Sequence, residues 1–68
     1  MIKNKNLIIV MPVYNEEQII KKVASDWLKV AEIHKGDLLI INDGSKDQTF
    51  KILKKINRKN LILINQKN

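Results

Sequence analysis

The stretch that decides the fold is DLLIINDGSKDQT, residues 37–49. It begins with an almost unbroken apolar run and ends in a polar segment, and Asn42, Asp43 and Gly44 stand between the two parts. An apolar run without alternation is typical of a strand buried on both faces, as in a parallel sheet. We therefore predict a strand at about 37–42, a turn after it, and a helix beyond the turn.

Two further apolar runs of the same kind lie on either side of this stretch. LIIVMPV begins at Leu7 and NLILIN begins at Asn60. Both runs are rich in Ile, Leu and Val, and the β-branched residues among them favour strands. The sequence therefore predicts two more strands, at about 7–12 and 60–65.

Amphipathic patterns fill the two gaps between the predicted strands. Apolar residues recur every three or four positions within 19–31, and the same spacing returns over a shorter length within 50–56. Such spacing is typical of a helix with one buried face. We predict helices at about 16–34 and 46–57.

Residues at the helix ends indicate how each helix begins or stops. Ser45 followed by Gln48 fits a capping box, in which the Ser hydroxyl accepts a hydrogen bond from a free backbone N–H of the helix. Lys35 and Gly36 suit the end of the first helix, because Gly adopts a left-handed conformation and Lys complements the helix dipole.

The predicted order is strand, helix, strand, helix, strand, and right-handed crossovers turn it into three adjacent parallel strands. The fold class is therefore α/β, a three-stranded parallel βαβαβ unit over residues 1–68 that corresponds to half of an open Rossmann-like nucleotide-binding sheet. Both helices are expected on one face, which leaves the other apolar face and at least one strand edge uncovered. We expect the unit to be incomplete as given, part of a longer polypeptide or dependent on a partner.

Composition narrows the possible chemistry. The chain has 13 Lys and Arg against 7 Asp and Glu, a net charge of +6, no Cys and a single His, His34. These counts exclude disulfides, Cys-based metal sites and multi-histidine sites.

The positive charge attracts anions, but the lysines are scattered without aromatic residues between them, so we expect no nucleic-acid partner. The N-terminal apolar run is too short for a signal sequence or a membrane span, which predicts a cytoplasmic protein.

Two loops follow the first two predicted strands, PVYNEE from Pro12 and NDGSKDQ from Asn42. Ligands of open α/β sheets bind outside the carboxyl ends of the strands, so the loops should face one crevice. Tyr14 offers a flat ring for a base, Glu16 a carboxylate for hydroxyl groups, and Asp43 an acceptor for the imino N–H of uracil or guanine. The alternative is that these residues are purely structural: a turn and helix start in the first loop and an Asx-type turn in the second. Neither loop carries a glycine-rich phosphate-binding motif.

Taken together, LIIVMPVYNEEQII and the later LLIINDGSKDQT resemble the N-terminal part of a family 2 glycosyltransferase with the GT-A fold. The resemblance runs over nearly the whole chain, from Leu7 to about Asn65. The segments YNEE and DGSKDQT are most similar to the branch of dolichyl- or undecaprenyl-phosphate sugar synthases. Members of the family transfer a sugar from a nucleoside diphosphate donor, usually UDP- or GDP-linked, to lipid phosphates, polysaccharides or other acceptors.

The resemblance implies nucleotide-binding roles for five residues of the two loops. In the family pattern the base pocket is lined by the residues that match the end of the first strand, a carboxylate in the next loop helps to hold the nucleoside, and an Asp after the second strand hydrogen-bonds the base. The matching residues are Pro12, Val13, Tyr14, Glu16 and Asp43.

The resemblance also implies Mg²⁺ or Mn²⁺ on the diphosphate of the full-length enzymes, held by a D-x-D motif, and a catalytic carboxylate further along. This chain contains no D-x-D motif. We therefore expect no metal site, no cofactor and no catalytic residue within it. Asn42 stands where many members have Asp, and members with Asn are common.

The predicted function is the nucleoside-diphosphate-binding portion of a glycosyltransferase, inactive alone because the metal site and the catalytic base are missing. Its predicted partner is a UDP- or GDP-linked sugar, and its acceptor would be met at the cytoplasmic membrane surface. The alternative is a non-catalytic α/β module that self-associates through the uncovered sheet face.

Overall fold

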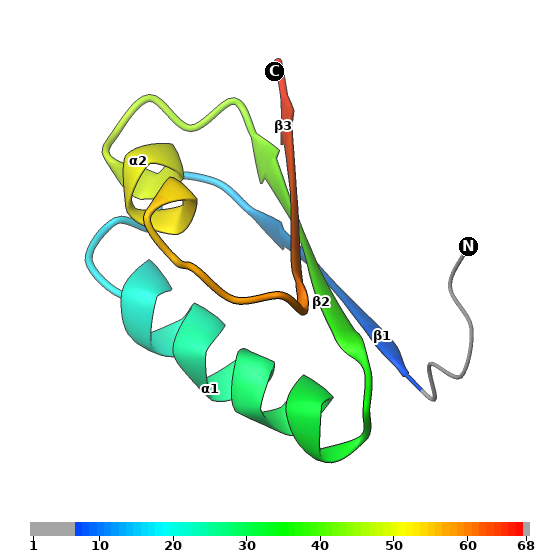
Figure 1. The fold of residues 1–68 in the computed structure, drawn as a ribbon. Helices are drawn as coiled ribbons and strands as arrows, with labels where there is room; N and C mark the ends of the chain where they lie inside the picture. The colour runs from blue at the N-terminus through cyan, green and yellow to red at the C-terminus, as the bar shows by residue number, and fades with distance from the viewer. Residues whose placement is uncertain (1–6, 68) are drawn as a thin grey trace.

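The computed structural model describes residues 7–67, and it contains the five elements that the sequence predicts, in the predicted order (Figure 1). The predicted domain, 1–68, also includes residues 1–6 and 68, which lie outside the described residues. The α/β fold class is confirmed. The elements are β1 (Ile8–Val13), α1 (Ile20–Ile33), β2 (Asp37–Asp43), α2 (Thr49–Lys54) and β3 (Leu61–Gln66).

The three strands form one parallel sheet in the order β1-β2-β3. Val10 of β1 is level with Leu39 of β2, and Leu39 is level with Ile62 of β3. Both helices lie on the same side of the sheet (Figure 1). All three strands therefore end at one edge, where the loops that lead into α1 and α2 begin.

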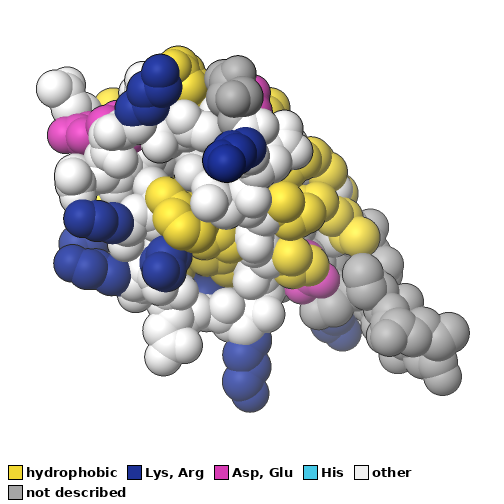
Figure 2. All heavy atoms as spheres, turned by 90° about the horizontal axis from the view of Figure 1, so that it is seen from above, with side chains coloured by type: hydrophobic (Ala, Val, Ile, Leu, Met, Phe, Trp, Pro, Cys, Tyr) yellow, Lys and Arg dark blue, Asp and Glu magenta, His cyan; other side chains and the backbone are white. Residues whose placement is uncertain are grey.

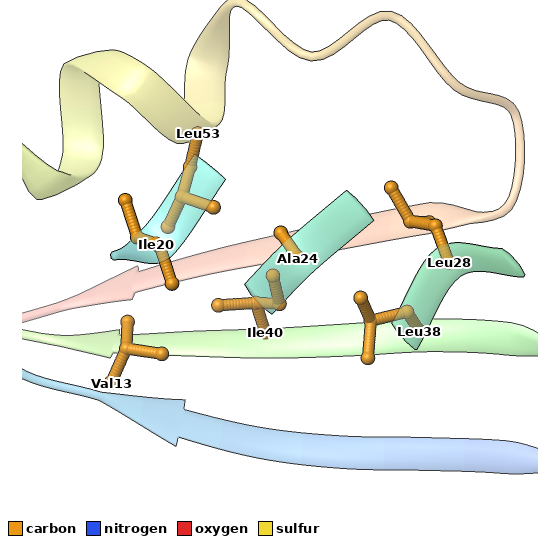
Figure 3. Close-up of a cluster of buried hydrophobic side chains, with 7 residues drawn as sticks. All are labelled: Val13, Ile20, Ala24, Leu28, Leu38, Ile40 and Leu53. Carbon is orange, nitrogen blue, oxygen red and sulfur yellow. The ribbon is translucent and has the colours of Figure 1, made fainter. Parts of the chain in front are cut away.

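The hydrophobic core lies between the helices and the sheet (Figure 3). Leu38 and Ile40 point from β2 toward the helices and are completely buried, and Ala24 of α1 packs over them. Because Ala has a short side chain, the backbone of α1 approaches the sheet closely. Seven buried residues make up this core: Val13, Ile20, Ala24, Leu28, Leu38, Ile40 and Leu53.

The opposite face of the sheet is covered by no helix of the described chain. Its side chains alternate with those of the core, and Val10 is 55% exposed, Ile64 44% and Ile62 38%. Hydrophobic side chains gather on the side away from the helices (Figure 2). The expected uncovered apolar face is therefore present.

Both helices begin later than the sequence predicts. The Glu16 carbonyl accepts hydrogen bonds from the N–H groups of Ile19 and Ile20, so residues 16–19 form a turn and α1 begins at Ile20. The second helix begins at Thr49, and the proposed capping box at Ser45 was wrong. The Ser45 hydroxyl instead contacts the β1–α1 loop and the end of β2, as described below.

The end of α1 has the predicted kind of turn, but with the roles of two residues exchanged. Gly36 N lies 2.7 Å from Ala31 O and Lys35 N lies 3.0 Å from Glu32 O, the two hydrogen bonds of a Schellman motif. The left-handed residue is Lys35, with φ 54°, and not Gly36. Gly36 is required by packing, because a Cβ at this position would lie 2.2 Å from the carbonyl oxygen of Leu7.

Candidate functional site

The residues predicted to bind a nucleotide meet at the carboxyl ends of β1 and β2. Val13, the last residue of β1, is level with Asn42 of β2, and Tyr14 and Asp43 are the residues that directly follow this pair. The side chain of Pro12 is exposed on the uncovered face, and Asp43 occupies the same side of the pleat as Ile41. The two strand ends thus bring Pro12, Tyr14 and Asp43 into one region.

The side chains of the five predicted residues differ in how exposed they are. Tyr14 is 45% exposed and Glu16 is exposed, so both side chains are accessible to a ligand. The side chain of Val13 is only 7% exposed and packs in the core. Any contact between Val13 and a ligand therefore involves its backbone.

Three successive backbone N–H groups of the β1–α1 loop donate to side chains of the β2–α2 segment. The Asn15 N–H donates to Ser45 Oγ with an N···O distance of 2.9 Å. The N–H of the next residue, Glu16, donates to Thr49 Oγ1 (2.8 Å), and that of Glu17 to Asp47 Oδ2 (3.2 Å). These donors are therefore not available to hold a phosphate group.

Two hydrogen bonds run in the opposite direction and complete the junction. The Lys46 N–H donates to Asn15 Oδ1 at 2.8 Å, and the Gln48 N–H donates to Glu17 Oε1 at 2.9 Å. Asn15 has a φ of 50°, the left-handed conformation that Asn adopts more readily than most residues. Five hydrogen bonds thus join the two loops into one unit.

The three carboxylates of this junction have different uses. Glu17 and Asp47 each accept a backbone hydrogen bond from the opposite loop, so both carboxylates help to hold the two loops together. The Glu16 carboxylate makes no hydrogen bond or ion pair with any residue that the structure describes. Of the three, Glu16 is the one whose acceptor capacity is left for a ligand.

The Asp47 carboxylate is the most strongly engaged group of the junction. Partial burial acts to raise its pKa, but the hydroxyl and N–H of Thr49 and the N–H of Glu17 all donate to the charged form. Together these hydrogen bonds hold the pKa of Asp47 below its ordinary value. Asp47 was not among the residues predicted from the sequence, although an Asp two residues before a Thr at a helix start is a recognisable Asx turn.

Asp43 and its neighbours extend the site toward β3. Gln66 Nε2 donates a hydrogen bond to Asp43 Oδ1 at 3.2 Å, so the predicted base acceptor is in contact with an amide donor of β3. Next to them is a shallow hollow at the ends of β2 and β3. The hollow is lined by Gly44, Ser45, Lys46, Asn65, Gln66 and Lys67. No feature of the sequence pointed to Gln66, because its position depends on the pairing of β3 with β2.

The described residues do not fit a metal centre or a membrane span. Within residues 7–67 no three side chains of His, Cys, Asp or Glu come together in a group that could hold a metal ion. His34 is the C-cap residue of α1, at the opposite end of the helix from the β1–α1 loop. Neither helix in this part of the chain is long and apolar enough to cross a bilayer.

The family of this chain follows from comparison with models of known protein families. The model of the family described as glycosyl transferase family 2 matches residues 8–68. The chain belongs to glycosyl transferase family 2. The match includes both loops of the site, and it confirms the resemblance found in the sequence.

Two curated relatives show how much of a family 2 protein this chain represents. A UDP-N-acetylglucosamine–dolichyl-phosphate N-acetylglucosaminyltransferase of Methanococcus voltae is 39% identical over 54 residues, which are 78% of this chain and 20% of that protein. An uncharacterized protein of Methanocaldococcus jannaschii is 39% identical over 66 residues, 91% of this chain and 27% of that protein. The chain thus spans about a fifth to a quarter of the length of these relatives. No solved structure matches it significantly.

Proposed function

We propose that this chain forms the nucleoside-diphosphate-binding portion of a glycosyltransferase that takes its sugar from a nucleotide-sugar donor. One observation carries the proposal. In a chain of family 2, an exposed aromatic ring, Tyr14, and a carboxylate, Asp43, directly follow the paired residues Val13 and Asn42 of adjacent strands, beside loops that five hydrogen bonds hold together. Open α/β sheets bind nucleotides outside the carboxyl ends of their strands, which is the edge where these residues lie.

The proposed roles follow from what each side chain presents. Tyr14 packs its ring against the base, and Asp43 accepts a hydrogen bond from the imino N–H of uracil or guanine. The unengaged carboxylate of Glu16 accepts from hydroxyl groups of the ribose. Pro12 borders the base with its ring, and Val13 contributes its backbone because its side chain is in the core.

The donor and acceptor classes are proposed from the relatives. The Methanococcus voltae protein is named for UDP-N-acetylglucosamine and dolichyl phosphate. A UDP-linked sugar suits an acceptor carboxylate at Asp43, because uracil carries an imino N–H, and a GDP-linked sugar would suit it for the same reason. A polyprenyl phosphate acceptor would place the protein at a membrane surface.

These 68 residues are proposed to bind the donor without transferring the sugar. Displacement at the anomeric carbon requires the charge of the diphosphate to be stabilised and the acceptor hydroxyl to lose its proton. The backbone N–H groups of residues 15–17 are occupied by the opposite loop. The Asp47 carboxylate is likewise occupied, by Thr49 and Glu17.

Nucleotide discrimination tests the proposed site. We expect UDP or GDP to bind more tightly than CDP or ADP by roughly tenfold or more, because cytosine and adenine present a lone pair where uracil and guanine present an imino N–H. The Asp43→Ala variant should lose this preference, and Tyr14→Ala should weaken the binding of all four. Calorimetric titration of the 68-residue chain measures each affinity.

The matched control is Asp26→Ala, which removes an exposed carboxylate from α1, where it pairs with Lys22. This variant has the same net charge as Asp43→Ala and should bind like the unmodified chain. Equal affinity of the unmodified chain for all four nucleotides, or an equal loss of affinity in the two Asp variants, would show that Asp43 does not recognise the base. Sugar transfer by the chain alone would contradict the proposed lack of catalysis.

A second candidate function, self-association, is favoured by the uncovered sheet face. Val10, Ile62 and Ile64 expose between 38% and 55% of their surface there, and Ile8 exposes 45%. Contiguous exposed apolar residues mark association surfaces. Sedimentation velocity tests this candidate, and a folded monomer at high concentration would exclude it.

A further inference from the structure

Asn42 is a buried polar residue of β2 that the proposed base contacts leave without a role. It is 1% exposed and stands directly before Asp43. Both ends of its side-chain amide are engaged. Its Nδ2 donates to Asn65 Oδ1 of β3 at 2.8 Å, and its Oδ1 accepts a short hydrogen bond from the Ser45 hydroxyl.

The hydrogen bonds of Asn42 are part of a longer chain that crosses the site. The Asn15 N–H donates to Ser45 Oγ, the Ser45 hydroxyl donates to Asn42, and Asn42 donates to Asn65. Every donation points in the same direction, so each hydrogen bond polarises the next. We call this series the amide chain. It connects β3 and β2 to both loops.

The first residue of the amide chain, Asn15, has a left-handed backbone conformation. Asn15, with φ 50°, is held at its N–H by Ser45 and at its side chain by the N–H of Lys46. Tyr14 and Glu16 flank Asn15 in the sequence. Their directions therefore depend on the backbone conformation of Asn15.

We propose that Asn42 is the positioning residue of the nucleotide site: through Ser45 it orders the β1–α1 loop and so holds Tyr14 and Glu16 in place relative to Asp43. The effect on binding rests on the proposed nucleotide function, whereas the ordering of the loop does not. Because Asn42 is 1% exposed, this role is carried out through its neighbours and not by contact with the ligand.

Two substitutions at Asn42 separate this role from simple packing. Asp in this position accepts from the Ser45 hydroxyl and, after rotation of the Asn65 amide, from Asn65 Nδ2, so Asn42→Asp retains both links. Leu has the same branched arrangement of four side-chain heavy atoms, although it is larger, and it neither accepts nor donates, so Asn42→Leu breaks both links. Ser45→Ala interrupts the same chain at a less buried position, and it serves if Asn42→Leu does not fold.

The experiment combines NMR hydrogen exchange with UDP titration of the 68-residue chain. We expect the N–H groups of Asn15 and Lys46 to exchange about fivefold faster or more in Asn42→Leu and Ser45→Ala. UDP affinity should fall by a similar factor. In Asn42→Asp, the exchange rates and the UDP affinity should both stay within about twofold of those of the unmodified chain.

The matched control is Asn60→Ala, which removes a hydrogen bond from Asn60 Nδ2 to Leu28 O (3.3 Å) at the other end of the sheet. It should destabilise the chain without changing exchange at Asn15 or the affinity for UDP. Unchanged Asn15 exchange in Asn42→Leu and Ser45→Ala would overturn the positioning role. Faster exchange with unchanged UDP affinity would overturn its importance for binding. If the unmodified chain binds no nucleotide, the proposed function fails, and Asn15 exchange still decides whether Asn42 orders the loop.

Discussion

At the scale of single residues, Asp47 shows how one carboxylate can support two loops at once. Its Oδ1 accepts from the N–H of Thr49 in its own segment, and its Oδ2 accepts from Glu17 in the other loop. A neutral side chain would accept these hydrogen bonds less strongly, since charge-assisted hydrogen bonds are the stronger kind. The junction therefore depends on the ionised form of Asp47.

The stability of the chain should consequently depend on pH through Asp47. Its pKa is lower in the folded chain than the value of about 3.9 for an unfolded Asp. The unfolded state therefore binds the proton more readily, and the stabilisation is present above about pH 4 and is lost as pH falls through the folded pKa. Urea unfolding at a series of acidic pH values measures the effect.

The Asp47→Asn variant should show a smaller loss of stability over the same acidic range. Asp26→Asn, on the exposed surface of α1, provides the control and should leave the pH dependence nearly unchanged. Identical pH profiles for Asp47→Asn and the unmodified chain would mean that Asp47 is not the group responsible.

At the scale of elements, the end of α1 shows two adjacent residues with opposite steric needs. Lys35 is in the left-handed region, which strains any side chain with a Cβ. Gly36 is buried and lies against the backbone of Leu7, where no Cβ fits. The turn that leads from α1 into β2 thus stores strain at one residue and relies on a missing side chain at the next.

Substitution at these two positions should change stability in opposite directions. Lys35→Gly should raise the free energy of unfolding by about 1 kcal/mol, because Gly adopts the left-handed conformation without strain. Gly36→Ala should lower it by about 2 kcal/mol or more, because the backbone of Leu7 must move. Urea denaturation of both variants tests this, and destabilisation by Lys35→Gly would contradict the assignment of strain.

At the scale of the whole molecule, the two faces of one sheet have different environments. On the helix side Leu38 and Ile40 are completely buried, whereas on the other side Val10 and Ile62 remain more than a third exposed. Hydrophobic burial therefore stabilises one face within the chain, while the other face remains available for association.

Matched substitutions on the two faces should separate stability from association. Ile40→Ala should cost about 2 to 4 kcal/mol through the lost contacts and the cavity it leaves. The double variant Val10→Thr with Ile62→Thr should cost no more than about 1 kcal/mol, and it should reduce self-association in sedimentation velocity. If the double variant associates as strongly as the unmodified chain, the uncovered face is not the association surface.

The sequence by itself determined the order of elements, the parallel sheet and the region of the site. Uninterrupted apolar runs and helical spacing are local signals, and right-handed crossovers leave one arrangement for β1, β2 and β3. The positions of Pro12, Tyr14 and Asp43 at the strand ends follow from that arrangement. Their roles in binding remain a proposal.

Only the tertiary structure decided which polar groups are used to build the site and which are left for a ligand. Ser45 had the local pattern of a helix cap, yet its hydroxyl contacts Asn15 and Asn42. Glu16 and Glu17 are neighbours with identical side chains, yet only the carboxylate of Glu17 is occupied by the opposite loop. The hydrogen bonds between the loops join residues 30 to 33 positions apart. Such partners are chosen by the approach of two loops in space, which local sequence patterns do not encode.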